Sequence, residues 1–143
     1  MIEVEIEDEA WTKALPQAEI LAMMAGGAAL AGGGSVAVLL TSDEEVALLN
    51  QQFRGKAGPT NVLSFPAPPN PDDSRGDIAL AYGVCAREAA EQGKTLADHL
   101  QHLVAHGVLH LLGYDHQTEA EAEAMEALER AILSGIGVSD PYA

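Results

Sequence analysis

The stretch SVAVLLTSDEEVALLNQQF, residues 35–53, places two different patterns next to each other. Its first part, SVAVLLT, is a nearly continuous apolar run, which is typical of a strand that is buried on both faces. Ser42 and Glu45 then form a capping-box pair, so a helix should begin there and run to about Phe53. A buried strand that leads directly into a helix predicts a fold in which helices pack on a sheet.

The segments on either side of this stretch supply the other elements. The alternating IEVEI near the N-terminus predicts a half-exposed strand, and a helix is expected from Trp11 to about Ala31, with Pro16 near its first turn. NVLSF and GDIALAY predict two further strands, separated by a loop rich in Pro, Asn and Asp. Three more helices are expected over residues 84–92, 96–112 and 118–133.

These elements fit one small domain over residues 1–143. The predicted fold class is α+β, with a mixed four-stranded sheet packed with helices. The last helix should carry Met125, Leu128 and Ile132 on its apolar side. Its acidic residues should form a solvated face, and they are Glu119, Glu121, Glu123, Glu126 and Glu129.

The formal net charge of −15 opposes long-range attraction of a polyanion. Most basic residues nevertheless lie in the middle of the chain, as Arg54, Lys56, Arg75, Arg87 and Lys94. Cys85 is the only cysteine, which excludes a disulfide framework and a thiolate metal cluster. The acidic N-terminus and the lack of a long apolar run lead us to expect a cytoplasmic protein without a membrane partner.

The stretch HGVLHLLGYDH, residues 106–116, concentrates three histidines near the end of a predicted helix. His106 and His110 are four residues apart, so their rings should leave the same face of the helix. Gly113 can end the helix, and the turn after it can bring His116 back over the helix end. Three neutral imidazoles with a fourth position open are typical of a catalytic zinc. We interpret His99 and His102 as surface residues or as residues behind the ligands, and Asp115 as part of the turn.

The spacing of these histidines matches that of metzincin proteases, but the glutamate that follows the first histidine in their motif is Gly107 here. A protease without this general base lacks the group that deprotonates the attacking water. Phosphodiester cleavage fits better, provided that a positive charge stabilises the transition state. Arg54 and Lys56 are the candidates for that charge, although two solubilising surface charges would explain them equally well.

Three motifs in the same order resemble those of the YbeY family of bacterial zinc-dependent endoribonucleases and rRNA maturation factors. They are FRGKAGPTNVLSFP at 53–66, RGDIAL at 75–80 and HGVLHLLGYDH at 106–116. The resemblance implies an endoribonuclease that is specific for single-stranded RNA. It further implies roles in the maturation of the 3′ end of 16S rRNA, in ribosome quality control and in late assembly of the small ribosomal subunit.

The same resemblance implies site residues and partners. One zinc ion is expected on His106, His110 and His116, and the essential arginine of the family falls on Arg54. Lys56 fits the same basic patch and joins Arg54 as a candidate for binding the substrate. The expected partners are single-stranded RNA, 16S rRNA, and the small ribosomal subunit with its assembly factors.

The residues leave some alternatives open. The protein could be another metal-dependent hydrolase, such as a protease whose base comes from elsewhere, or an assembly factor in which zinc only holds the fold. For RNA cleavage, either an activated water or the ribose 2′-OH could attack first.

Overall fold

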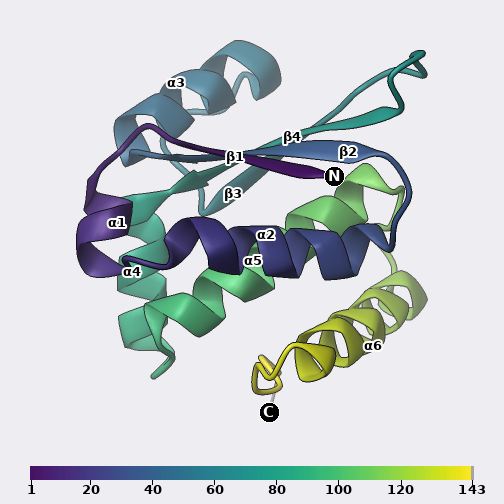
Figure 1. Ribbon diagram of the computed structural model, residues 1–143. Helices are drawn as coiled ribbons and strands as arrows, with labels where there is room; N and C mark the ends of the chain where they lie inside the picture. The colour runs from purple at the N-terminus through teal and green to yellow at the C-terminus, as the bar shows by residue number, and fades with distance from the viewer. Residues whose placement is uncertain (143) are drawn as a thin grey trace.

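A four-stranded sheet separates helix α3 (Asp43–Arg54) from α2, α5 and α6 in the computed structural model, which describes residues 1–142 (Figure 1). The strand order is β1-β2-β4-β3. Strands β1 (Ile2–Ile6), β2 (Ser35–Thr41) and β4 (Ser74–Ala81) are parallel, whereas β3 (Val62–Pro66) runs antiparallel to β4. The predicted α+β class and the mixed four-stranded sheet are therefore confirmed.

Strand β2 lies inside the sheet and leads into α3, as its sequence predicts. Val36, Val38 and Leu40 belong to the large apolar core that the sheet forms with the helices on its other face. The hydroxyl of Ser42 accepts a hydrogen bond from the backbone N–H of Glu45 at 3.2 Å, which caps α3. Helix α3 covers only part of its face of the sheet, over a small cluster that includes Val46, Leu63 and Ala79.

The helix expected from Trp11 to Ala31 is two helices, α1 (Ala10–Ala14) and α2 (Ala18–Leu30). Leu15 has φ −143° and ψ 87°, because a residue before proline is driven out of the helical region. The break lets Trp11 turn fully inward, where its Nε1–H donates to the carbonyl of Thr41 at 3.0 Å. The prediction of one helix over this stretch was therefore wrong, and Pro16 is the reason.

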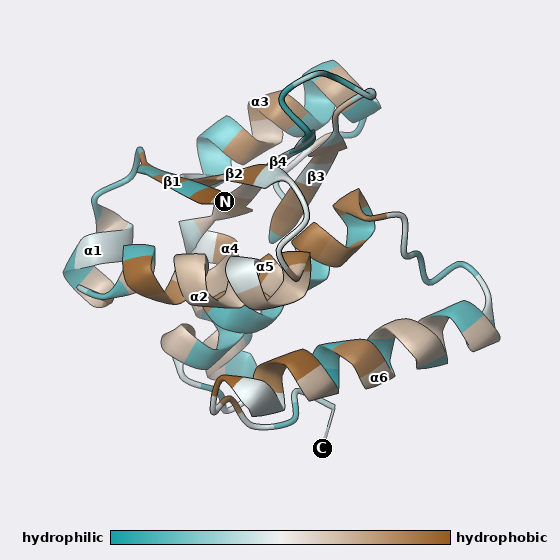
Figure 2. Cartoon of the chain, turned by 45° about the vertical axis from the view of Figure 1, so that its right-hand side comes forward, coloured by the Kyte–Doolittle hydropathy of each residue, from teal (hydrophilic) through white to brown (hydrophobic). Residues whose placement is uncertain are grey.

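The C-terminal half forms three helices, α4 (Tyr82–Glu91), α5 (Leu96–Leu111) and α6 (Glu119–Gly135). N-cap residues fix where α5 and α6 begin. The Thr95 side chain accepts a hydrogen bond from the backbone N–H of Asp98, and Thr118 forms a capping box with Glu121. Helix α5 lies against the sheet and carries many hydrophobic residues, which are drawn in brown in Figure 2. None of the helices within residues 1–142 has the length and apolar content needed to cross a membrane.

Helix α6 packs through Met125, Leu128 and Ile132, as predicted. The prediction that all its glutamates are solvated was wrong at Glu129, which is 0% exposed. Glu129 lies four residues from both Met125 and Leu133, which are also buried, so helical spacing places it on the packed face.

Helix α5 approaches the sheet closely at Gly107. A Cβ atom at Gly107 would lie 3.1 Å from Cγ2 of Ile78 on β4 and 3.4 Å from Oγ of Ser64 on β3. The Ser64 hydroxyl also donates a hydrogen bond to the carbonyl of Gly107 at 3.2 Å. A methyl group at the position beside His106 would therefore displace its neighbours by a few tenths of an ångström, and the longer, charged side chain of a glutamate would displace them further.

We expect Gly107→Glu to lower the free energy of unfolding by at least about 3 kcal/mol, because it overfills a packed contact and buries a charge. Gly27→Glu is the matched control, because Gly27 is an exposed residue of α2 with open space around it. The control should change stability by less than about 1 kcal/mol. Urea unfolding measures both variants, and equal stability of the two would contradict the close packing at Gly107.

Candidate metal centre and adjoining groove

The last two turns of α5 bring two imidazoles together. The Nε2 atoms of His106 and His110 lie 3.0 Å apart, with ring centroids 4.5 Å apart. Two ligand nitrogens on one tetrahedral zinc lie about 3.3 Å apart, given a metal–nitrogen distance of about 2.0–2.1 Å. The spacing of the two nitrogens is thus close to that of ligands sharing one ion.

A turn after α5 brings the third imidazole to the same place. Gly113 has φ 102°, a left-handed conformation that glycine adopts without strain, and its N–H donates to the carbonyl of His110. The ring of His116 then lies 5.6 Å from that of His106 and 5.0 Å from that of His110, between centroids. One ring nitrogen from each histidine lies within 4.8 Å of the others, so the three could hold one metal ion.

Hydrogen bonds on the far side of two rings orient them toward this point. Nδ1 of His106 lies 2.6 Å from Oε1 of Glu129, and Nδ1 of His110 lies 3.0 Å from the carbonyl oxygen of Tyr114. Both partners are acceptors, so we assign the proton to Nδ1 in each ring. The Nε2 atoms are then left with free lone pairs, which is the form that binds a metal.

The donor chemistry fits a divalent ion that prefers nitrogen ligands, such as zinc. Burial, with the neighbouring imidazoles of His106 and His116, lowers the pKa of His110 below its ordinary value of 6.5. A neutral ring at physiological pH is what metal binding requires. Among the residues that the structure describes, three side chains converge here, which would leave a fourth position of a tetrahedral ion open.

Glu129 is a part of this site that the sequence analysis missed. Burial alone would raise the pKa of this carboxyl, but hydrogen bonds from His102, His106 and Tyr142 outweigh burial and hold its pKa well below its ordinary value. Burial and the carboxylate together raise the pKa of Tyr142, so its hydroxyl remains a donor. The position of Glu129 on the apolar stripe of α6 was the signal that could have revealed it.

The remaining histidines of α5 have separate roles. Of the two interpretations of His99, a surface residue or a residue behind the ligands, the first was wrong, because His99 is buried and its Nε2 lies 3.0 Å from the carboxylate of Glu88. His102 lies behind His106, with ring centroids 6.3 Å apart. The carboxylate of Asp115 accepts the N–H of His116 at 2.8 Å, which agrees with a role in the turn.

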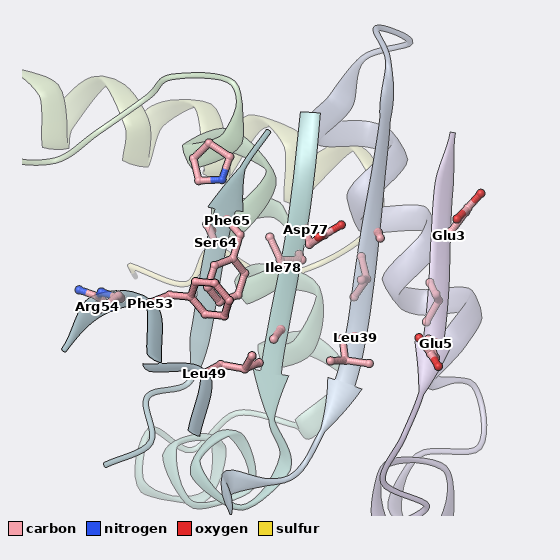
Figure 3. A pocket seen from close by; sticks show the side chains of 15 residues that line it. Glu3, Glu5, Leu39, Leu49, Phe53, Arg54, Ser64, Phe65, Asp77 and Ile78 are labelled. Carbon is pink, nitrogen blue, oxygen red and sulfur yellow. The ribbon is translucent and has the colours of Figure 1, made fainter. Parts of the chain in front are cut away.

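A cavity of about 660 Å³ opens in front of the three histidines. It is walled on the opposite side by residues of β3 and by Arg54. A second hollow, a groove of about 900 Å³, lies on the face of the sheet that α3 leaves open (Figure 3). Arg54, Ser64 and Pro66 line both spaces, so the cavity and the groove adjoin at these residues.

Arg54 is the last residue of α3 and not part of the following loop, because Gly55 ends the helix in a left-handed conformation. Among residues 1–142 no carboxylate lies within ion-pair distance of Arg54, whereas Arg75 and Arg87 pair with Asp73 and Asp43. Lys56 is exposed and lines neither hollow. The structure therefore brings Arg54, but not Lys56, to the wall of the histidine cavity.

The charge along the groove changes between the end at Arg54 and the side formed by β1 and β4. Glu3 and Glu5 on β1 and Asp77 on β4 line it, and all three are exposed (Figure 3). On the α3 side, Phe53 packs edge to face on Phe65, with ring centroids 5.4 Å apart. An anion would be repelled along the acidic side and attracted at Arg54.

Comparison with known proteins finds the same family over most of the chain. The family model described as Endoribonuclease YbeY matches residues 2–137. Endoribonuclease YbeY of Maricaulis maris is 51% identical over 145 residues, covering 99% of this chain and 91% of the relative. The namesake protein of Paramagnetospirillum magneticum is 49% identical over 155 residues, covering 99% and 94%. A solution structure from Thermotoga maritima matches with a TM-score of 0.60 at 29% identity, covering 95% of this chain and 91% of that one.

We expect the chain to bind one Zn²⁺ ion at neutral pH, and His110→Ala to weaken this binding more than about 100-fold. Loss of an outer-sphere partner costs roughly 10- to 100-fold, and loss of a ligand should cost more. His99→Gln is the control, because His99 pairs with Glu88 and should leave zinc binding unchanged. Competition with a chromophoric chelator measures the affinities, and equal affinity of His110→Ala and wild type would contradict the site.

Proposed function

The chain belongs to the Endoribonuclease YbeY family, and from this we propose that it is a zinc-dependent endoribonuclease that cuts single-stranded RNA. In this proposal it matures the 3′ end of 16S rRNA and takes part in ribosome quality control. It acts in the cytoplasm as one domain over residues 1–143, together with the small ribosomal subunit and its assembly factors. The coarser conclusion, an RNA-cleaving hydrolase, follows from family membership itself.

One observation supports the proposal most directly. Arg54 ends α3, and the three histidines belong to α5 and the turn after it, yet all four side chains line the same cavity. Phosphodiester hydrolysis needs an activated nucleophile and a positive group that stabilises the extra charge of the transition state. The cavity combines candidates for both.

The histidines supply the first requirement. His106, His110 and His116 would hold the zinc ion, with the ring orientations of His106 and His110 set by Glu129 and Tyr114. Zinc in such a site acts as a Lewis acid and lowers the pKa of a bound water to about 7. Gly107 leaves no carboxylate at the position where a metzincin carries its base, so a peptidase function gains no support here.

Arg54 supplies the second requirement. Its guanidinium presents a planar fork that matches the oxygens of a phosphate. No carboxylate among residues 1–142 forms an ion pair with it, so an RNA phosphate has no internal competitor. We propose Lys56 as a weaker, neighbouring contact to the RNA backbone. Because the chain carries a net charge of −15, delivery of the substrate by the ribosome fits better than capture of free RNA over a long distance.

We expect Arg54→Glu to lower kcat/KM for a single-stranded RNA about 100- to 1000-fold, the usual cost of losing one donor to a charged transition state. Zinc affinity should stay unchanged, since Arg54 is not among the groups that converge on the ion. Lys13→Glu makes the same charge change on exposed α1 and should have little effect. Wild-type activity in Arg54→Glu would contradict the role of Arg54, and peptide cleavage that depends on His110 would contradict the nuclease proposal.

The products of the same reaction distinguish the two routes of attack. A 2′,3′-cyclic phosphate end shows that the ribose 2′-OH attacks first and excludes water as the first nucleophile. With a 2′-deoxy nucleotide at the cleavage position, attack by the ribose 2′-OH is impossible, whereas attack by water continues. End-group analysis of a short labelled RNA by mass spectrometry reads both results.

A further inference from the structure

We propose that Glu129 and Tyr142 are positioning residues for the metal centre, and that the segment after α6, residues 137–142, completes it by holding Glu129 against His106. The inference rests on the proposed metal site, and it concerns residues that contact no ion and no substrate themselves. The observation behind it is a series of hydrogen bonds that runs from Tyr142 through Glu129 to His106.

Glu129 is arranged to hold one ring in one orientation. Its side chain is 1% exposed, and its Oε1 lies 2.6 Å from Nδ1 of His106. An imidazole that donates from Nδ1 to a carboxylate can neither flip nor move its proton to Nε2 without losing this bond. The carboxylate also makes the opposite nitrogen a better electron donor to a metal.

Tyr142 holds the other oxygen of the same carboxylate. Its hydroxyl donates to Oε2 of Glu129 and lies 3.3 Å from Nε2 of His102. With both oxygens occupied, the carboxylate cannot rotate away from His106. Tyr142 thus reaches His106 through the carboxylate of Glu129, and it also contacts His102, whose ring packs on His106.

The segment that carries Tyr142 is itself docked. Asp140 accepts the backbone N–H of Tyr142 at 2.8 Å and the Nε–H of Arg130 at 3.2 Å. The guanidinium of Arg130 lies 5.2 Å from the centre of the Tyr142 ring, a cation–π contact. The ring of His102 packs edge to face against that of Tyr142, with centroids 5.5 Å apart. These contacts fix the phenol where it meets Glu129.

Stability alone does not explain a carboxylate at this place. Met125 and Leu133 flank Glu129 on the same face of α6, and both are buried in the apolar core. A buried charged group with its partners is often no more stabilising than apolar residues of similar volume. A carboxylate aimed at a candidate metal ligand is accounted for by the orientation that it gives to that ligand.

The test is a double-mutant cycle on zinc affinity with Glu129→Gln, Tyr142→Phe and the combined variant. Glu129→Gln should bind Zn²⁺ about 10- to 100-fold more weakly than wild type, the range for loss of an outer-sphere partner. Tyr142→Phe should bind several-fold more weakly, and the combined variant should be no worse than Glu129→Gln, because Tyr142 acts through Glu129. Glu123→Gln on exposed α6 surface and Tyr82→Phe on α4 are the matched controls and should bind as wild type does.

A second readout excludes a merely structural role. In the metal-free protein, the Nδ1–H proton of His106 should appear far downfield by NMR, and it should move upfield in both Glu129→Gln and Tyr142→Phe. Variants that lose only thermal stability, while this signal and the zinc affinity stay within twofold of wild type, would overturn the inference, as would additive losses of zinc affinity.

Should Glu129→Gln fail to fold, Tyr142→Phe at the edge of the network still decides. Wild-type protein without zinc binding would refute the metal site as well, whereas equal binding by wild type and variants refutes the positioning role alone.

Discussion

The close approach of α5 to the sheet at Gly107 is the constraint on which the site depends. With no side chain between them, the helix rests on Ile78 and Ser64, and its last turns carry His106 and His110 past β3. Beyond β3 stands Arg54, so the same packing sets the cavity that the histidines and the arginine share. It also removes the carboxylate that a metalloprotease needs beside its first histidine. Gly107 therefore affects both how closely α5 packs on the sheet and which groups stand beside His106.

Much of this arrangement could be predicted from local patterns, because the physics involved is local. The apolar run of β2, the cap at Ser42 and the left-handed turn at Gly113 each depend on residues a few positions apart. Pro16 shows the limit, since one helix with Pro16 near its first turn was expected, whereas the extended backbone of Leu15 before the proline divides the stretch into α1 and α2. The chemistry of phosphodiester cleavage named Arg54 and Lys56 only as candidates, and the family resemblance favoured Arg54. The meeting of Arg54 with the histidines depends on strand order, which no local pattern contains.

Glu129 could not be assigned from composition, because an acidic run is usually a solvated helix face. Its burial depends on three partners that lie elsewhere in the chain, His102, His106 and Tyr142. The charged groups of this molecule have different surroundings. Exposed carboxylates line the groove, and the buried carboxylate of Glu129 is hydrogen-bonded to the imidazole of His106. Arg54 has no carboxylate partner among residues 1–142. The net charge of −15 describes none of these local fields.

A crystal structure of the zinc-loaded protein, with the ion located by anomalous scattering, tests the central claim most directly. We predict one ion about 2.0–2.1 Å from ring nitrogens of His106, His110 and His116, with no protein group in the fourth position. Glu129 should remain on Nδ1 of His106, and Arg54 should face the same cavity. An ion bound elsewhere, or a fourth side chain that closes the coordination sphere, would contradict a catalytic metal centre at the end of α5.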